Sequence, residues 1–498
     1  MTSVKNTTKQ SGFWKRCQEM LGNEFDAFCS SQSSPLPKTI RINTLRNEKD
    51  DFFEWQRAMH PDWKLTPHIF GEHIFSIERE HRKTPLGKSL GHVQGRFYVQ
   101  EASSCLPPLA LDIRPGQKVL DMAASPGSKT TQIAALMRGK GLLVANEYSA
   151  SRIKTLVFNL QKTGVSHALV TRFSGEKFAD FLPNFFDRIL LDAPCTGEGT
   201  ARKDPDALAH WSEKRIHAAA ILQRSLLRSA FLALKTGGLL TYSTCTLAPE
   251  ENEAVVSSLQ EQFFDAVEVV DICHLFPGAN AARGLLSYDN HSFPHGKKML
   301  RIWPHAFNSE GFFVATIRKT KDTPSLPKKR FVMHGHKRLN MGEILRHKDS
   351  TTHFVREYFL RTFSFSLPKE RLLFRRHSDI WLLPEGAEAI LPAVRCERLG
   401  IRLGKIIPPQ RTHTSPMFRL SNEAVLAFGQ HFSGECVYRT SHAEACAFLQ
   451  GNNISCAHPL PKQDIAVMHD GLPLGVGKSL GTVIKNNLPR HFLVGDVS

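Results

Sequence analysis

The central part of the chain alternates short apolar runs with amphipathic stretches, and this pattern predicts parallel strands joined by helices. Between two of the predicted strands, residues 216–234 have the apolar spacing of a helix, and the glycines of 235–238 are expected to end it. Helices between parallel strands cover both faces of a sheet, so we expect an α/β domain over residues 112–321. The predicted strands are 118–124, 142–148, 167–173, 187–193, 238–244 and 311–318.

The two flanks of this region follow other patterns. Residues 11–29 have the spacing of a helix and residues 39–46 alternate like a strand, so residues 1–111 predict a small α+β domain. After the α/β region, basic proline-containing segments at 324–330 and 336–338 predict a linker, within an intermediate domain over 322–410. Prolines 408 and 409 suggest a further boundary. In the last domain, 411–498, residues 464–478 predict a β-hairpin with glycines at its turns.

Charge points to a polyanionic partner. The 498 residues include 64 Lys and Arg against 47 Asp and Glu, which gives a formal charge of +17. Solubility alone is one explanation for such an excess. In a chain long enough for several domains, nucleic acid is the simplest partner, and we expect residues 1–111 and 411–498 to bind RNA.

The cysteine and histidine patterns do not predict a metal site or a disulfide framework. The ten cysteines form no CxxC pair, and Cys436, Cys446 and Cys456 lack the close pairs that zinc sites use. The 23 histidines form no HExxH pattern, so no catalytic metal is expected. The polar first ten residues lack a signal-peptide core, and no run approaches the ~20 apolar residues of a membrane span. We therefore expect a cytoplasmic protein without a membrane anchor.

The turn after the first predicted strand has features of a cofactor site. Residues 121–130 read Asp-Met-Ala-Ala-Ser-Pro-Gly-Ser-Lys-Thr, with one glycine where the dinucleotide fingerprint has three. Its small residues still allow a ligand close to the start of a helix. Glu147 lies 20 residues past Gly127, at the end of the next strand, where a carboxylate can bind both ribose hydroxyls. An ordinary strand-to-helix turn is the alternative, and the Glu147 spacing favours a ribose-bearing cofactor.

Two cysteines follow neighbouring predicted strands. Asp192 and Cys195 come after the fourth strand and Cys245 after the fifth, so all three are expected at the carboxyl edge of the sheet, near Gly127. A lone cysteine is usually a small buried residue, but two in such positions suit an alkylation that needs a nucleophile and a second acid/base group. This combination points to a methyltransferase acting on C5 of a pyrimidine. Residues 471–479 resemble a phosphate loop, but Leu472 stands where that motif needs glycine.

With these residues assembled, the chain resembles the NOL1/NOP2/Sun family of RNA 5-methylcytosine methyltransferases. The resemblance implies a Rossmann-like methyltransferase sheet and S-adenosylmethionine as the methyl donor. Its length and a PUA-like ending at 475–490 resemble the members that modify 16S rRNA, which implies the cytidine at position 1407 as target. We expect that rRNA within the small ribosomal subunit as partner, and a monomeric enzyme. The segments that carry the resemblance are 98–104, 121–130, 191–199, 242–246, 301–305 and 311–315.

The resemblance also implies roles for the candidate site residues. Cys245 matches the nucleophile that adds to C6, Asp192 the residue facing N3 of the base, and Cys195 the group that assists release. Lys129 is expected to stabilise charge near the base or to lower a thiol pKa. Which cysteine is the nucleophile rests on the resemblance alone. Cys195 follows a proline, as the nucleophile of DNA 5-methylcytosine enzymes does, so the residues by themselves leave the opposite assignment open. The implied cofactor-binding residues are Ala123, Ala124, Ser125, Pro126, Gly127, Ser128, Lys129, Glu147, Ser174 and Asp192.

One position departs from the family pattern, and two other functions stay open. The third strand leads into Phe173, Ser174 and Gly175, where the family usually has an aspartate that contacts adenine. A tRNA cytosine-C5 methyltransferase is the first alternative function. The second is a non-catalytic RNA-binding protein of ribosome assembly, which would need neither thiol. We expect the region after about Lys328 to supply RNA affinity rather than chemistry, so that its removal would leave cofactor binding intact.

Overall fold

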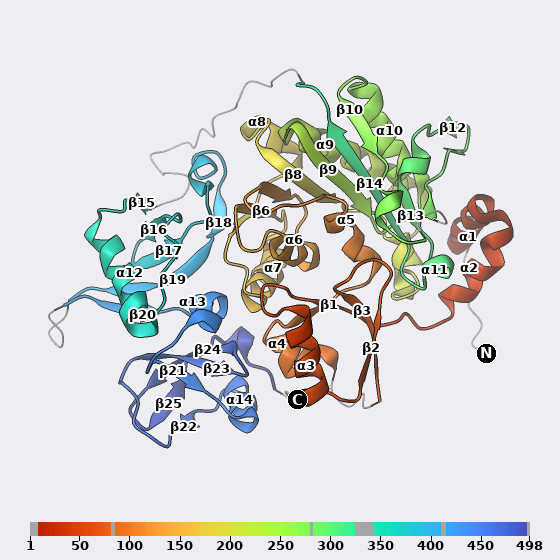
Figure 1. Cartoon of the computed structure of the whole chain (residues 1–498). Helices are drawn as coiled ribbons and strands as arrows, with labels where there is room; N and C mark the ends of the chain where they lie inside the picture. Colours follow the sequence, from red (N-terminus) through yellow and green to blue (C-terminus); the bar gives the residue numbers. More distant parts are fainter. Residues whose placement is uncertain (1–7, 81–84, 279–281, 324–341, 410–414, 496–498) are drawn as a thin grey trace.

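The computed structural model describes residues 8–80, 85–278, 282–323, 342–409 and 415–495. Within them, a nine-stranded sheet forms the centre of the molecule, in the order β10-β14-β9-β8-β5-β6-β7-β18, with β13 paired to β14 (Figure 1). The run from β9 to β7 is parallel, whereas β14 is antiparallel to β9. The strands are β5 (Lys118–Asp121), β6 (Leu142–Asn146), β7 (Ala168–Thr171), β8 (Phe186–Asp192), β9 (Leu234–Thr244), β10 (Val267–Val270), β13 (Leu300–Ile302), β14 (Phe312–Lys319) and β18 (Cys396–Leu399).

The six strands predicted from the sequence are present, and the Rossmann-like α/β class is confirmed. Successive strand residues point to opposite faces of the sheet: Val119 joins one apolar cluster and Leu120 the other. Helices α6 (Ser128–Leu136) and α7 (Ala150–Lys162) cover the first face. Helices α8 (Phe178–Phe181), α9 (Glu213–Ala233) and α10 (Glu253–Gln262) lie on the second. The sequence order reverses between β5 and β8, which places a ligand crevice at their carboxyl ends.

Helix α9 ends within one residue of the predicted position, but the glycine stop that was expected to end it was wrong. The helix ends at Ala233, and Leu234 is already extended as the first residue of β9. The glycine pair that was expected to stop the helix lies inside β9, where the pairing with β8 shifts register. Pairing of Leu234 with Phe186 on β8 therefore ends the helix before the glycines are reached.

The N-terminal region forms an antiparallel sheet of order β2-β3-β1-β4. The predicted strand at 39–46 is shorter than expected and ends at Ile42. The predicted helix at 11–29 is divided by a 3-10 turn at Gly22–Glu24, and its two halves pack beside Trp211 and Trp303. The elements are β1 (Thr39–Ile42), β2 (Trp63–Pro67), β3 (Ile74–Arg79), β4 (Phe97–Val99), α1 (Thr8–Leu21), α2 (Phe25–Gln32), α3 (Lys49–Met59), α4 (Leu90–Val93) and α5 (Leu106–Leu109).

The C-terminal part contains two five-stranded sheets, on the side of the molecule away from α1 and α2 (Figure 1). The predicted hairpin is β23 and β24, and the segment that resembles a phosphate loop lies largely in β24. The predicted linker at 324–330 and 336–338 lies outside the described residues. The elements are β15 (Glu343–Leu345), β16 (Leu373–Arg376), β17 (Asp379–Leu382), β19 (Ile401–Ile407), β20 (Met417–Leu420), β21 (Val437–Arg439), β22 (Ile454–Ser455), β23 (Asp464–His469), β24 (Leu472–Ser479), β25 (Val483–Asn486), α12 (Ser350–Phe363), α13 (Asn422–Phe428) and α14 (His442–Leu449).

Strand β18 joins the C-terminal part to the central sheet. It pairs antiparallel with β7, so a segment close to residue 400 forms one edge of the central sheet. Next to it, the guanidinium of Arg371 donates to the backbone oxygen of Ser166 at 2.6 Å. Phe374, Leu383 and Val394 belong to the same apolar cluster as the strands of that sheet. The two regions therefore share one core. No helix in the described part of the chain is long and apolar enough to cross a membrane.

Candidate active site

The turn between β5 and α6 is built for close approach of a ligand. Gly127 caps the helix with φ +108°, a conformation that L side chains rarely adopt. The backbone oxygens of this turn are held by α7: Arg152 donates to Ser125 at 2.7 Å and Asn159 to Pro126 at 2.9 Å. The predicted small residues therefore lie at the positive end of a helix, and hydrogen bonds from α7 hold their backbone in place.

Asn146 connects three loops of this site, and the sequence analysis missed it. Its amide nitrogen donates to the backbone oxygens of Met122 and Phe173, at 3.1 and 3.0 Å. Its oxygen accepts from the backbone nitrogen of Phe173 at 3.0 Å. The ends of β5, β6 and β7 are thus held together, which brings Ser174 to the same edge as the turn at Gly127. A buried asparagine at a strand end was the available signal, since a buried polar group must find partners.

Glu147 follows directly at the end of β6, as predicted, and only 4% of it is exposed. One carboxylate oxygen accepts from the backbone nitrogen of Ser149 at 2.8 Å, and the other lies 3.5 Å from Arg152. The ring of the next residue, Tyr148, is 77% exposed. A fixed carboxylate beside an exposed ring offers hydrogen-bond acceptors and a flat apolar surface to a nucleoside.

The two thiols meet at the carboxyl ends of β8 and β9. The Sγ atoms of Cys195 and Cys245 are 3.4 Å apart, and both residues are partly exposed. A hydrogen bond to Cys245, burial and the nearby charges of Cys245 and Glu251 raise the pKa of Cys195 well above that of a free thiol. Cys195 therefore holds its proton, and either sulfur can be the donor in the hydrogen bond between the two thiols.

A charged pair lies at the same edge. Lys129 Nζ is 2.7 Å from Asp192 Oδ2, and Ser243 donates to the other oxygen of Asp192 at 2.7 Å. Burial works to lower the pKa of Lys129, but Asp192, Cys245 and Asp121 together raise it above its ordinary value. Lys129 thus stays protonated, and it also donates to Ser104 Oγ at 3.0 Å. Neither serine was singled out from the sequence.

The buried Asp121 is a further feature of the turn. Thr130 in α6 donates to one of its carboxylate oxygens at 2.7 Å, and the other has no hydrogen-bond partner among the described residues. Burial raises the pKa of Asp121 to about 7, with the charge of Asp192 adding to the effect. The site thus places cofactor-type acceptors, an ion pair and two thiols along one edge of the sheet.

Comparison with known families agrees with this arrangement. The model described as 16S rRNA methyltransferase RsmB/F matches residues 108–318, which hold the cofactor turn, the ion pair and both thiols. The N-terminal domain of 16S rRNA methyltransferase RsmF matches 10–102, and the methyltransferase RsmF PUA domain matches 436–494. A ribosomal RNA small subunit methyltransferase F from Erwinia tasmaniensis is 38% identical over 97% of this chain and 96% of its own. The chain belongs to the RsmF family.

Other relatives support the same family assignment. A ribosomal RNA small subunit methyltransferase F from Escherichia coli O1:K1 is 39% identical, over 94% of this chain and 93% of its own. Among solved structures, a methyltransferase homologue from Pyrococcus horikoshii is 32% identical with a TM-score of 0.54, over 62% of this chain and 94% of its own. The RsmF-type PUA domain coincides with β21 to β25, so the β-rich C-terminal region expected from the sequence is confirmed.

Proposed function

We propose that this protein transfers a methyl group from S-adenosylmethionine to C5 of a cytidine in 16S rRNA, through a covalent bond between Cys245 and C6. The observation that carries the proposal is the 3.4 Å contact of two thiols beside the Lys129–Asp192 pair. A protein that only binds RNA needs neither feature. Membership of the RsmF family, whose relatives are named as rRNA methyltransferases, supports the choice of reaction and substrate.

The residues around Gly127 fit the proposed cofactor. The start of α6 provides the positive end of a helix dipole for a carboxylate, and Glu147 provides acceptors for two ribose hydroxyls. We expect Tyr148 and Ser174 to contact the adenine base of the cofactor, in place of the aspartate that the family resemblance led us to expect. When bound there, S-adenosylmethionine supplies an electrophilic methyl group.

The polar groups account for the first half of the reaction. C5 of cytosine is a poor nucleophile until a thiolate adds to C6, which places an electron pair at C5. Cys245 has the cation Lys129 close enough to interact electrostatically, and a cation favours the thiolate that must attack. Asp192, fixed by Lys129 and Ser243, is placed to bind the N3 edge of the base and to favour that addition.

Cys195 suits the second half of the reaction, in which the methylated base is released from Cys245. After methylation, the C5 proton must leave so that the C5–C6 double bond forms again and expels the Cys245 thiolate. The sulfur of Cys195 lies 3.4 Å from that of Cys245, so it is close to the base that Cys245 would attack. Once Cys195 has given its own thiol proton to solvent, its thiolate accepts the C5 proton.

The test separates the two thiols. Cys245→Ala should abolish methyl transfer and form no adduct with RNA. Cys195→Ala should still attack and then stall, leaving protein bonded to RNA as a denaturant-resistant band on a gel, because addition precedes elimination. Labelled methyl transfer is measured to 30S subunits, naked 16S rRNA and tRNA. Cys446→Ala, which removes a partly exposed thiol on α14, is the matched control and should behave like the wild type.

Each competing function has its own outcome. An adduct from Cys245→Ala and none from Cys195→Ala would exchange the roles of the thiols. Transfer to tRNA alone would replace the rRNA substrate by the first alternative. RNA binding with no transfer to any of the three RNAs would favour the non-catalytic alternative.

A further inference from the structure

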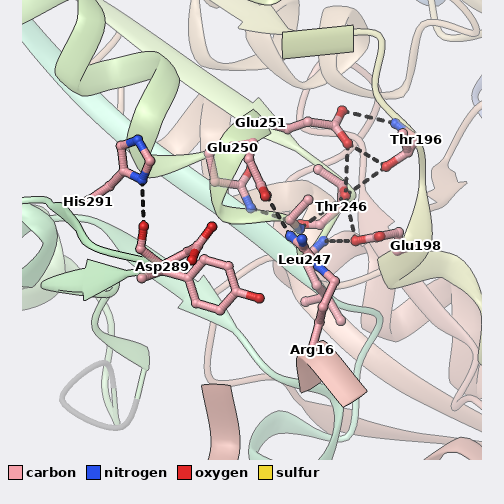
Figure 2. A network of polar contacts seen from close by, with 12 residues as sticks. Arg16, Thr196, Glu198, Thr246, Leu247, Glu250, Glu251, Asp289 and His291 are labelled. Carbon is pink, nitrogen blue, oxygen red and sulfur yellow. Dashed lines mark hydrogen bonds and ion pairs between the residues drawn. The ribbon is translucent and has the colours of Figure 1, made fainter. Parts of the chain in front are cut away.

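The residues next to the two cysteines belong to a chain of polar groups that the mechanism above does not use (Figure 2). Each cysteine is followed by a threonine, and the hydroxyls of Thr196 and Thr246 are 3.0 Å apart. Thr196 Oγ1 also lies 2.5 Å from Glu251 Oε1, and Thr246 Oγ1 lies 3.0 Å from Glu198 Oε2. The four groups form one series, from Glu251 through the two threonines to Glu198, and both carboxyl groups are buried.

The number of protons in this series is one too few if both carboxyl groups are ionised. The three contacts join four oxygen atoms, and each contact needs one hydrogen. The two threonines supply one hydroxyl hydrogen each, so one contact would bring two oxygens together without a proton. A buried acceptor facing another acceptor is costly, and a third proton on one carboxyl group removes that cost.

The neighbours indicate which carboxyl group carries the proton. Both oxygens of Glu198 accept from N–H groups: Oε1 from Trp211 Nε1 and Oε2 from the backbone nitrogen of Leu247 at 3.3 Å. On Glu251, Oε2 accepts from the backbone nitrogen of Thr196 at 3.1 Å and from Gln223 at 2.7 Å. Glu251 Oε1 faces only the two hydroxyls. Of the four carboxyl oxygens of Glu198 and Glu251, Oε1 of Glu251 is therefore the one that can carry a proton and donate it to a threonine hydroxyl.

We propose that Glu251 keeps a proton on Oε1 and, through Thr196 and Thr246, holds the loops of Cys195 and Cys245 together. Glu251 is then a positioning residue for the reaction proposed above, on which this role rests. No proton is transferred to the substrate: the protonated carboxyl group donates to Thr196, Thr196 to Thr246, and Thr246 to Glu198. Loss of that proton leaves Glu251 and Thr246 competing for the one hydroxyl hydrogen of Thr196, and the two loops lose a link.

The charges around Glu251 favour a neutral carboxyl group below about pH 7. Burial raises the pKa of Glu251 to about 7, and the charge of Glu198 adds to this. The other titratable groups that face it are Cys195 from the loop after β8 and Tyr242 from β9. Arg16 of α1 is paired with Glu250 at 2.6 Å, and Glu253 of α10 is paired with Arg301. Neither of these cations forms an ion pair with Glu251.

The first experiment compares Glu251→Gln with Glu251→Ala. The amide of glutamine can place its NH₂ where Oε1 donates and its oxygen where Oε2 accepts, so Glu251→Gln should imitate the protonated side chain. Methyl transfer by Glu251→Gln should equal that of the wild type at pH 6 and exceed it by about tenfold at pH 9, the value of one hydrogen bond. Glu251→Ala should be about tenfold slower than the wild type at pH 6. Glu250→Gln, which changes the adjacent carboxylate outside the series, should keep the wild-type pH profile.

A second readout does not depend on RNA. Phenylarsine oxide binds two thiols only when they are close, so the rate of capture of the Cys195–Cys245 pair reports their spacing. The ratio of capture rates for Glu251→Gln and wild type should rise with pH through about 7, as the wild type loses its proton. If the wild-type protein methylates none of the RNAs, the proposed function fails, and this ratio still decides the role of Glu251.

A pair of threonine variants keeps the test independent of how well the Glu251 variants fold. Thr196→Ser keeps the hydroxyl and should behave as wild type, whereas Thr196→Val breaks the series. In the Thr196→Val background, Glu251→Gln should no longer change the pH profile, because the two residues act through the same hydrogen bonds. The proposal would be overturned if the ratio of Glu251→Gln to wild type did not vary with pH, in either the rate of methyl transfer or the rate of thiol capture. It would also be overturned by a Glu251→Gln variant as defective as Glu251→Ala at pH 6.

Discussion

At the scale of single residues, the site depends on polar side chains that each bind groups from two or three strands. The sequence indicated Cys195, Cys245, Asp192 and Lys129 because their chemistry is distinctive. It gave no reason to select Asn146 or Ser243, because an asparagine or a serine at a strand end is ordinary until its partners are known. The structure shows that Asn146 holds the ends of β5, β6 and β7 together and that Ser243 donates to Asp192.

Glu147 permits a prediction at this scale. Glu147→Ala should weaken S-adenosylmethionine binding by about 10- to 150-fold, since it removes charge-assisted hydrogen bonds worth roughly 1.5–3 kcal/mol. RNA affinity should change little. Calorimetry with the cofactor measures the first effect, and Glu176→Gln, an exposed carboxylate bonded to Ser225, is the control. Undiminished cofactor binding by Glu147→Ala would refute the assignment.

At the scale of elements, contacts between strands and helices decided the boundaries that local pattern left open. Helix α9 ends where Leu234 begins to pair with β8, and α1 and α2 separate at Gly22, whose φ is +53°. Strand β13 is held to α10 by Arg301 and Glu253, a pair whose side chains are 1% and 0% exposed. Arg301 also donates to the backbone oxygen of Leu247 at 2.7 Å, which connects this pair to the loop of Cys245.

Breaking this buried pair should be costly. Arg301→Met leaves the carboxylate of Glu253 buried without its cation, and the expected loss is about 3–5 kcal/mol of unfolding free energy. Denaturant titration measures it. Arg361→Ala, which removes an exposed partner of Glu357 one turn away on α12, should cost at most about 1 kcal/mol. Equal losses for the two variants would contradict this account of the pair.

At the scale of the whole molecule, the C-terminal half is part of the catalytic fold. From the sequence, deletion after about Lys328 was expected to leave cofactor binding intact. The structure changes that expectation, because the deleted part contains β18, Arg371 and apolar residues of the central core. Removing it exposes the edge of β7, which lies two strands from β5 and the cofactor turn.

A chain that ends at residue 328 should therefore lose thermal stability and cofactor affinity together with RNA binding. Leu399→Asp in the full chain should reproduce the loss of stability, because it buries a charge in β18, where Leu399 is 1% exposed. Met417→Asp, on the half-exposed surface of β20, should leave the melting temperature nearly unchanged. A truncated chain that melts like the full protein and binds cofactor normally would show that the two halves are independent.

The sequence by itself determined the α/β class, the six central strands, the PUA-like ending and the choice of candidate site residues. These features depend on local periodicity and on residue type, which a single segment displays. Only the tertiary structure decided the addition of β18 to the sheet, the end of α9, the link that Asn146 makes between three loops, and the hydrogen bonds from Glu251 to Glu198. Each of these requires residues between 24 and 230 positions apart to meet, or a short segment to choose between competing partners, and no local pattern records such contacts.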